Sequence, residues 1–260
     1  MRNKVAVVYG AGGAIGGAVA RAFASAGASV FLAGRTSAHV EMVAEDIVVA
    51  GGSAEAADVD ALDERAVDEH LDSVIDRAGR TDLSFNAIGI PSPKIRAPLV
   101  EIDVEQFCLP IATYTTSYFL TARLAARRML VAGSGVIMIV TAPPSRMGIP
   151  FVGGGGPAMA AVEALTRGLS AELAPHGVRV VGLRPQAIPE TARIRDGFES
   201  YAEASGSTWD RFHDSLASRT HTRRLSTLVE LANVAVFMAS DEASGMTGTT
   251  VNLAMGSLDD

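Results

Sequence analysis

A cluster of glycines near the start of the chain restricts the possible folds more than any other feature of the sequence. Residues 5–8 read VAVV, an apolar run typical of a strand that is buried on both faces. Apolar residues at helical spacing follow the glycines up to Gly27, and residues 29–32 read SVFL, a second buried strand. This order brings bare backbone N–H groups to a positive helix end, where a pyrophosphate can bind. The alternative is a tight turn that serves packing alone. The glycines are Gly10, Gly12, Gly13, Gly16 and Gly17.

The end of the second strand indicates which dinucleotide such a turn would bind. Folds that prefer NAD usually have an acidic residue there, which binds the adenine ribose hydroxyls. This chain has Gly34 and Arg35 instead, so no carboxylate repels a 2′-phosphate and a guanidinium is available to pair with it. We therefore expect NADP(H) as the cofactor, with NAD(H) as the other possibility. The alternative for Arg35 is to stack on adenine or to face water.

The composition argues against several classes of protein. The chain of 260 residues has a formal net charge of −7, which argues against nucleic acid as the main partner. Cys108 is the only cysteine, so no intrachain disulfide can form, and no signal peptide or membrane-spanning run is recognisable. We expect a cytoplasmic protein with no membrane partner. The five histidines show no metal-ligand spacing, so no metal site is expected.

Strands and helices alternate along the rest of the chain. We expect further strands at residues 54–59, 83–87, 135–141, 178–183 and 249–253, and helices at 37–50, 62–79, 103–131 and 157–175. Thr227 and Glu230 form a capping-box pattern that opens a last helix. Residues 185–222 are polar and lack periodicity, which predicts an irregular, lid-like segment at about 186–225. The alternation predicts one α/β domain over residues 1–260, a Rossmann-type doubly wound parallel β-sheet flanked by helices.

Several motifs in the right order carry a resemblance to a known family. Residues 9–16 read YGAGGAIG and are similar to a T-G-x-x-x-G-I-G turn. Residues 86–89 read NAIG and are similar to a shifted N-N-A-G motif. Residues 246–248 read MTG and are similar to an I-T-G motif. With residues 165–180, these motifs make the chain resemble the short-chain dehydrogenase/reductase family over nearly its whole length. The resemblance implies an oxidoreductase acting on a small carbonyl or alcohol substrate. The predicted cofactor-binding residues are Gly10, Gly12, Gly13, Ile15, Gly16, Arg35, Asp58, Val59, Asn86, Ala87, Gly89, Thr141, Pro185 and Ile188.

The catalytic positions depart from the family pattern. In the family, a Ser ends the fifth strand, and a Tyr and a Lys share one face of the next helix. Alignment on Gly135 and on residues 160–165 puts Ala142 at the Ser position, Gly155 at the Tyr position and Met159 at the Lys position. The family's Asn on the preceding long helix falls near Thr113. None of the replacements at the Ser, Tyr and Lys positions can donate or accept the proton that carbonyl reduction requires.

Residues at the same sheet edge, and Tyr201 in the lid-like segment, are candidates to replace the missing proton donor. The loops after the strands that end near residues 87 and 141 belong to the carboxyl edge of the sheet, where ligands bind in this class of fold. Each candidate has the alternative of an ordinary loop residue facing water. The catalytic candidates are Lys94, Ser145, Arg146 and Tyr201.

These observations leave three functional hypotheses open. The first is an NADP(H)-dependent oxidoreductase with a non-standard proton donor, because hydride chemistry belongs largely to the cofactor. The second is a non-catalytic, dinucleotide-binding sensor or partner subunit. The third is a non-redox enzyme that uses the same pocket. Fold alone does not choose between them, and the substrate cannot be read from the sequence.

The two helices at 103–131 and 157–175 also predict self-association. They resemble the pair that builds the family's dimer interface, so we expect a homodimer or a homotetramer. Aromatic and apolar residues recur along the long helix, at Phe107, Ile111, Tyr114, Tyr118, Ala122, Ala125 and Met129. The residues expected to offer apolar surface to a second copy are Leu120, Leu124, Ala158, Val162, Leu169 and Leu173.

Overall fold

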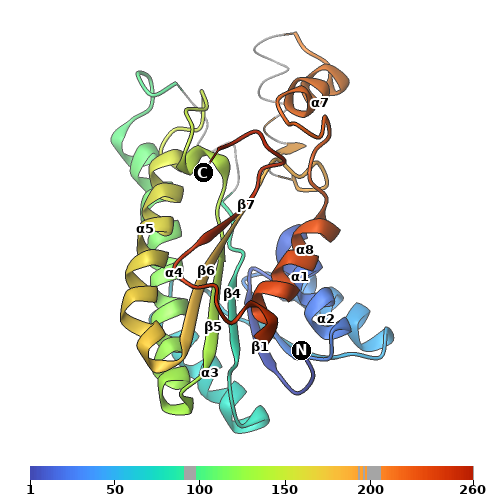
Figure 1. The fold of residues 1–260 in the computed structure, drawn as a ribbon, viewed down its shortest axis with the longest axis vertical. Helices are drawn as coiled ribbons and strands as arrows, with labels where there is room; N and C mark the ends of the chain where they lie inside the picture. The colour runs from blue at the N-terminus through green and yellow to red at the C-terminus, as the bar shows by residue number, and fades with distance from the viewer. Residues whose placement is uncertain (91–97, 193, 196, 198–205, 260) are drawn as a thin grey trace.

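The predicted parallel sheet is present. The computed structural model describes residues 1–90, 98–192, 194, 195, 197 and 206–259. Seven parallel strands pair in the order β3-β2-β1-β4-β5-β6-β7 (Figure 1). The chain therefore reverses direction across the sheet after β3, as a doubly wound α/β sheet requires. The strands are β1 (Val5–Tyr9), β2 (Ser29–Gly34), β3 (Ser53–Asp58), β4 (Leu83–Asn86), β5 (Gly135–Val140), β6 (Val178–Pro185) and β7 (Thr250–Leu253).

Helices cover both faces of the sheet. On one face α1 (Ala14–Ser25) packs against α2 (Ser37–Val49) and α8 (Leu228–Ala239), as the right side of Figure 1 shows. On the other face α4 (Val104–Ala132) lies between α3 (Glu64–Ala78) and α5 (Gly155–Leu173). Short turns of 3-10 helix lie at η2 (Pro143–Ser145), η3 (Ala174–His176) and η4 (Asp241–Ala243). The expected helices are confirmed, with bounds shifted by one or two residues.

Two apolar clusters, one on each face of the sheet, form the core. One joins β1, β2, β4, β5 and β6 to α1, α2 and α8, with Phe23, Leu32 and Phe85 fully buried. The other joins β1, β5 and β6 to α3, α4 and α5, with Tyr118 and Met129 fully buried. Because both faces are covered in the middle of the sheet, the central strands β1 and β5 consist of nearly unbroken apolar runs. Within the described part of the chain, no helix combines the length and the apolar character needed to cross a membrane.

Local sequence signals account for several helix boundaries. The Thr227 hydroxyl accepts the Glu230 N–H at 3.2 Å, and the Glu230 carboxylate accepts the Thr227 N–H at 3.0 Å. This reciprocal pair confirms the capping box expected at the start of α8. Helix α3 ends at Gly79, whose positive φ of 76° is the left-handed cap that glycine adopts at little cost.

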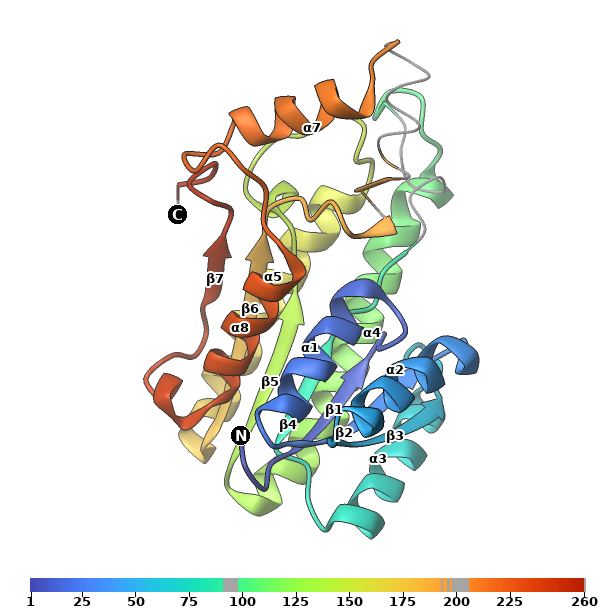
Figure 2. The ribbon, with the colours of Figure 1, turned by 90° about the vertical axis from the view of Figure 1, so that its right-hand side faces the viewer.

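One segment expected to be irregular contains a helix. Residues 209–218 form α7 (Trp209–Ser218), which lies beyond the carboxyl ends of the strands in Figure 2. The Thr208 hydroxyl caps it by accepting the Arg211 N–H. Its sequence mixes polar residues with apolar ones such as Trp209 and Leu216, and Ala217 is its one buried residue. The short apolar stripe explains why the sequence pattern was not recognised as a helix.

All but Leu169 of the residues expected to offer apolar surface to a second copy are buried instead. Leu120 and Leu173 are each 7% exposed, and Leu169 is only partly buried. Leu124, Ala158 and Val162 have no exposed surface at all. This expectation was wrong, because α4 and α5 turn these side chains toward the sheet and toward each other.

Two glycines in helix interiors provide a matched test of close packing. A Cβ at Gly16 in α1 would collide with the carbonyl oxygen of Gly10, whereas a Cβ at Gly168 in α5 has nothing within 4 Å. We predict that Gly16→Ala lowers the free energy of unfolding by about 1–3 kcal/mol through overpacking. Gly168→Ala should raise it by up to about 1 kcal/mol, because alanine loses less backbone entropy in a helix. Urea unfolding of both variants measures the difference, and equal effects would contradict it.

Candidate functional site

The glycine turn between β1 and α1 is closed by tight backbone contacts. Gly10 has a positive φ of 75°, and a Cβ there would lie 2.7 Å from the Ala87 carbonyl oxygen. Its N–H donates to the Ala33 carbonyl at 2.9 Å, and the Gly13 N–H donates back to the Gly10 carbonyl at 3.0 Å. The turn thus requires glycine at Gly10, and it joins the carboxyl ends of β1, β2 and β4.

The start of α1 has the properties of an anion site. Gly13 is the N-cap and offers no side-chain cap, and the first turn contains no acidic residue. The first N–H groups of a helix have no intrahelical acceptor, and here the earliest bond runs from Gly17 to Gly13. Gly13 and Ala14 are exposed, and Gly12 and Ile15 are half-buried. The uncapped helix end and the glycine turn fit the pyrophosphate of a dinucleotide.

The residues expected at the adenosine end lie side by side. Gly34 and Asp58 are direct partners in the β2–β3 ladder, and the Val59 N–H donates to the Gly34 carbonyl at 3.3 Å. Arg35 and Asp58 are exposed, whereas Val59 is buried. A guanidinium and a carboxylate therefore flank the sheet edge next to the glycine turn.

Asn86 holds the loop after β4 in place. Its side-chain amide donates to the Thr121 hydroxyl of α4 at 3.0 Å, and its side-chain oxygen accepts the Ile88 N–H at 3.1 Å. Asn86 is buried, and so its side chain fixes the backbone of Ala87 against Gly10. Gly89 is exposed, and a Cβ there would have nothing within 4 Å.

A buried ionic cluster lies behind the catalytic positions. Glu163 of α5 and Arg184 of β6 are 3% and 2% exposed at their side chains, and Arg184 donates from Nε to Glu163 Oε1 at 2.8 Å and from Nη2 to Oε2 at 3.2 Å. The same Oε1 accepts the Thr141 hydroxyl at 2.9 Å and the Ser145 hydroxyl at 2.6 Å. One carboxylate thus ties η2 and the end of β5 to α5 and β6.

This cluster keeps Glu163 ionised. Burial raises the pKa of Glu163, but hydrogen bonds from Arg184, Ser145 and Thr141, together with the Arg184 charge, outweigh it and lower the pKa below its ordinary value. A carboxylate held in this way cannot serve as a proton donor near neutral pH. The sequence analysis missed the cluster. The sequence signal that could have revealed it is Glu163 itself, an acidic residue that lies between Val162 and Thr166 on the buried side of α5.

Of the four catalytic candidates, the structure describes Ser145 and Arg146. Ser145 is engaged by Glu163, and Arg146 is exposed. Lys94 and Tyr201 lie outside the described residues. The Thr141 side chain also points to Glu163, and its N–H donates to the Leu183 carbonyl at 2.8 Å, so only its backbone remains for a cofactor.

The residues that the sequence alignment puts at the Ser and Lys positions, Ala142 and Met159, have apolar side chains. Met159 is 2% exposed and belongs to the α3–α5 side of the core, against which Ala142 and Ile88 also pack. Gly155 is buried at the first residue of α5, and the nearest atom to a Cβ there would be 4.0 Å away. Met159 and Ala142 therefore give this part of the structure an apolar lining. No group of three or more metal-binding side chains occurs among the described residues.

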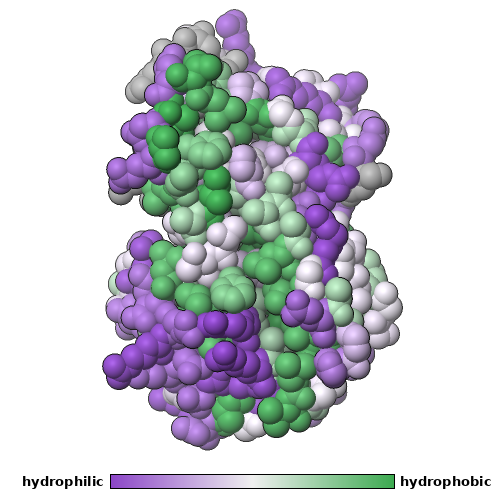
Figure 3. Space-filling model, turned by 90° about the vertical axis from the view of Figure 1, so that its left-hand side faces the viewer, coloured by the Kyte–Doolittle hydropathy of each residue, from purple (hydrophilic) through white to green (hydrophobic). Residues whose placement is uncertain are grey.

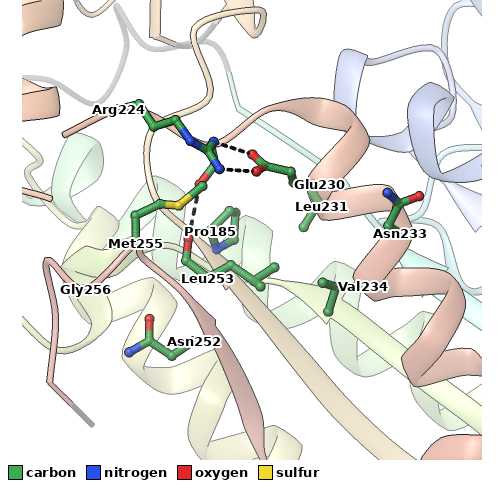
Figure 4. Close-up of a pocket in the computed structure, with 11 residues that line it drawn as sticks. Pro185, Arg224, Glu230, Leu231, Asn233, Val234, Asn252, Leu253, Met255 and Gly256 are labelled. Atoms are coloured by element: carbon green, nitrogen blue, oxygen red, sulfur yellow. Dashed lines mark hydrogen bonds and ion pairs between the residues drawn. The ribbon is translucent and has the colours of Figure 1, made fainter. Parts of the chain in front are cut away.

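A pocket of about 460 Å³ lies to one side of this site. It opens between α8 and β7, and Pro185 is the one predicted cofactor residue that lines it (Figure 4). Arg224 and Glu230 form its polar wall as a two-bond ion pair, with distances of 2.9 and 2.5 Å. The hydrogen bond from Arg224 lowers the pKa of Glu230 to about 2. Ile188 lies away from this pocket, buried in the core on the α1–α8 face.

The buried cluster leads to a prediction about stability. Glu163→Gln leaves the Arg184 charge buried without its counter-ion, which should lower the free energy of unfolding by about 3–5 kcal/mol at pH 7. The folded-state pKa of Glu163 is lowered, so its contribution is present above the unfolded pKa and is lost as the pH falls. The difference in the free energy of unfolding between the unmodified protein and Glu163→Gln should therefore become smaller as the pH falls.

Urea unfolding at pH 7 and at pH 4 measures this effect. Glu172→Gln, at an exposed position of the same helix, is the matched control and should stay within about 0.5 kcal/mol. A Glu163→Gln protein as stable as the control at pH 7 would contradict the role of the ion pair.

Comparisons with known proteins place the chain in a family. A sequence profile described as enoyl-(acyl carrier protein) reductase matches residues 10–257. (+)-Borneol dehydrogenase 2 of Salvia officinalis is 30% identical over 257 residues, covering 95% of this chain and 86% of that protein. An uncharacterized oxidoreductase of Bacillus subtilis is 30% identical over 251 residues, covering 96% and 89%. A gluconate 5-dehydrogenase structure from Burkholderia cenocepacia, in complex with NADP and tartrate, has a TM-score of 0.87 and 26% identity, covering 98% and 95%. The chain therefore belongs to the short-chain dehydrogenase/reductase family of oxidoreductases.

Proposed function

We propose that the protein is an NADP(H)-dependent oxidoreductase that acts on a small carbonyl or alcohol substrate with a non-standard proton donor. The observation that carries the proposal is the intact dinucleotide half of the site, with its glycine turn and uncapped α1. The bound cofactor would supply the hydride. The chain itself would hold the pyrophosphate at α1 and, through Asn86, keep the loop after β4 in place.

Arg35 supports NADP(H) over NAD(H). It is exposed directly after β2, and the ladder position before it is glycine rather than an acid. The gluconate 5-dehydrogenase of similar fold was solved with NADP. Both observations favour a 2′-phosphate at this edge of the sheet.

A second candidate is a non-catalytic, dinucleotide-binding sensor or partner subunit. It is favoured by the apolar side chains at Ala142 and Met159, which lie in the core and carry no proton to exchange. A third and weaker candidate is a non-redox enzyme that uses the same pocket. Consumption of NADPH with a ketone separates the oxidoreductase from both alternatives.

Self-association through α4 is a further part of the proposal. Leu109, Phe119 and Leu130 of α4 are 37%, 41% and 40% exposed, although they are large and apolar. Figure 3 shows this side of the molecule, where apolar surface covers much of the face and hydrophilic groups gather in its lower left part. Exposed apolar area of this kind supports a homodimer or a homotetramer.

The cofactor preference is tested by removing the guanidinium. We predict that Arg35→Ala weakens NADPH binding by about 1–3 kcal/mol, because a charge-assisted bond to the 2′-phosphate is lost. NADH lacks this phosphate, so its affinity should not change and it serves as the internal control. Fluorescence titration of both cofactors measures the affinities. Equal affinity of the unmodified protein for NADPH and NADH would contradict the assignment.

Self-association is tested with two phenylalanines of similar exposure on opposite faces. Phe119 of α4 is 41% exposed and Phe237 of α8 is 43% exposed. We predict that Phe119→Asp yields a monomer, because it places a charge in an apolar interface, whereas Phe237→Asp keeps at least the dimer. Light scattering at micromolar concentration measures the mass. A monomeric unmodified protein would rule out the assembly.

A further inference from the structure

We infer that His39 is a second contact for the 2′-phosphate of NADP(H), beside Arg35, and that it makes the preference for NADP(H) over NAD(H) depend on pH. The inference rests on the proposed NADP(H) function and adds a specificity-determining residue to it. His39 belongs to the first turn of α2, which begins two residues after Arg35. It is absent from the predicted cofactor-binding residues because it belongs neither to a glycine motif nor to a strand end.

His39 lies against the glycine turn. A Cβ built on Gly12 would lie 2.8 Å from the His39 Cβ and 3.4 Å from the Val40 nitrogen. Gly12 comes directly before Gly13, the N-cap of α1, where the pyrophosphate is proposed to bind. The absence of a side chain at Gly12 therefore lets the first turn of α2 approach the turn that would hold the cofactor.

The direction of the His39 side chain brings it toward Arg35. In an α-helix the Cα–Cβ bond is tilted toward the start of the helix, so a side chain in the first turn leans toward the residues that precede the helix. The Ala11 N–H donates to the Ala33 carbonyl of β2 at 3.2 Å, so the glycine turn also lies beside the strand end that carries Arg35. His39 and Arg35 therefore both lie next to Gly12.

Both side chains are available to a ligand. His39 and Arg35 are exposed, and within the described residues no hydrogen bond or ion pair engages either side chain. The residues one turn after His39 are Met42 and Val43, so no acid of α2 stands beside it at helical spacing. Two unpaired nitrogen-bearing side chains at one edge suit a phosphate, which accepts charge-assisted hydrogen bonds.

The other charged groups near His39 belong to the neighbouring elements. Arg21 of α1 is paired with Asp46 of α2 at 2.6 Å. Asp58 ends β3 and is an exposed carboxylate, which opposes an anion, whereas Arg35 favours one. These groups are the same in every variant at His39, so their effect cancels when the variants are compared.

A histidine differs from an arginine because its charge changes near neutral pH. Histidine side chains ordinarily change from cationic to neutral between pH 5 and pH 8, whereas arginine stays cationic. The cationic form attracts the 2′-phosphate, so the contribution of His39 to NADPH affinity is present at low pH and is lost as the pH rises. NADH has no 2′-phosphate, so its affinity should not follow this titration.

The test compares His39→Gln with the unmodified protein at pH 6 and at pH 9. At pH 6 the variant should bind NADPH about 3–30-fold more weakly, the range expected for one charged contact at a partly exposed site. At pH 9 the two proteins should agree within about twofold, and their NADH affinities should agree at both pH values. Fluorescence titration measures each Kd. Titration of the phosphate itself affects both proteins alike and cancels in their ratio.

A second variant separates charge from packing. His39→Lys stays cationic at pH 9 and should bind NADPH about 3–30-fold more tightly there than His39→Gln. Both variants keep the Cβ that contacts Gly12. His176→Gln is the matched control, because His176 is an exposed histidine that precedes β6 at the opposite edge of the sheet. Its Kd for NADPH should not change.

The outcomes also separate the inference from the proposed function. If the unmodified protein prefers NADPH and His39→Gln keeps its NADPH affinity at pH 6, the role of His39 fails and the NADP(H) proposal stands. A loss that is equal at pH 6 and pH 9, or a lysine variant no better than the glutamine variant at pH 9, would overturn the charge role of His39. If the unmodified protein does not prefer NADPH at either pH, the NADP(H) proposal and the inference both fail.

Discussion

The arrangement around the catalytic positions depends on one buried carboxylate. Glu163 and Arg184 are almost fully enclosed between α5 and β6, and such a pair is tolerated only when each charge is matched and hydrogen-bonded. The Thr141 and Ser145 hydroxyls complete the set of donors to Glu163. The cluster therefore fixes the loop that carries Ala142, and it commits its own acid to the ionised form. The proton for any reaction at this edge must come from elsewhere.

The two halves of the site differ in what they are made of. The dinucleotide half consists of backbone groups and glycines, such as Gly10 and Gly16, where any side chain would collide with the chain itself. Changing these residues would disturb the fold as well as binding. The catalytic half depends in the family on side chains, and at Ala142 and Met159 these are apolar in this chain. Side chains can be exchanged without moving the backbone, so apolar residues at these two positions are compatible with an unchanged fold.

The sequence predicted those features that local rules decide. The strand–glycine–helix order, the capping box at Thr227 and the alternation of strands and helices each depend on neighbours in the chain, and all are confirmed. The ion pair of Glu163 and Arg184 could not be predicted, because 21 residues separate its members and only the packing of α5 on β6 brings them together. Leu124 was misjudged for a related reason, since periodicity alone does not show how much of a long helix is covered.

The long helix α4 links these parts of the molecule. One of its faces carries Tyr114, Tyr118 and Thr121, which contact the loop at Ile90, Thr166 of α5 and Asn86 of β4 in turn. Each contact is a hydrogen bond in an apolar setting, where an unmade bond costs more than it does in water. The helix is therefore held in one register against both the cofactor loop and α5.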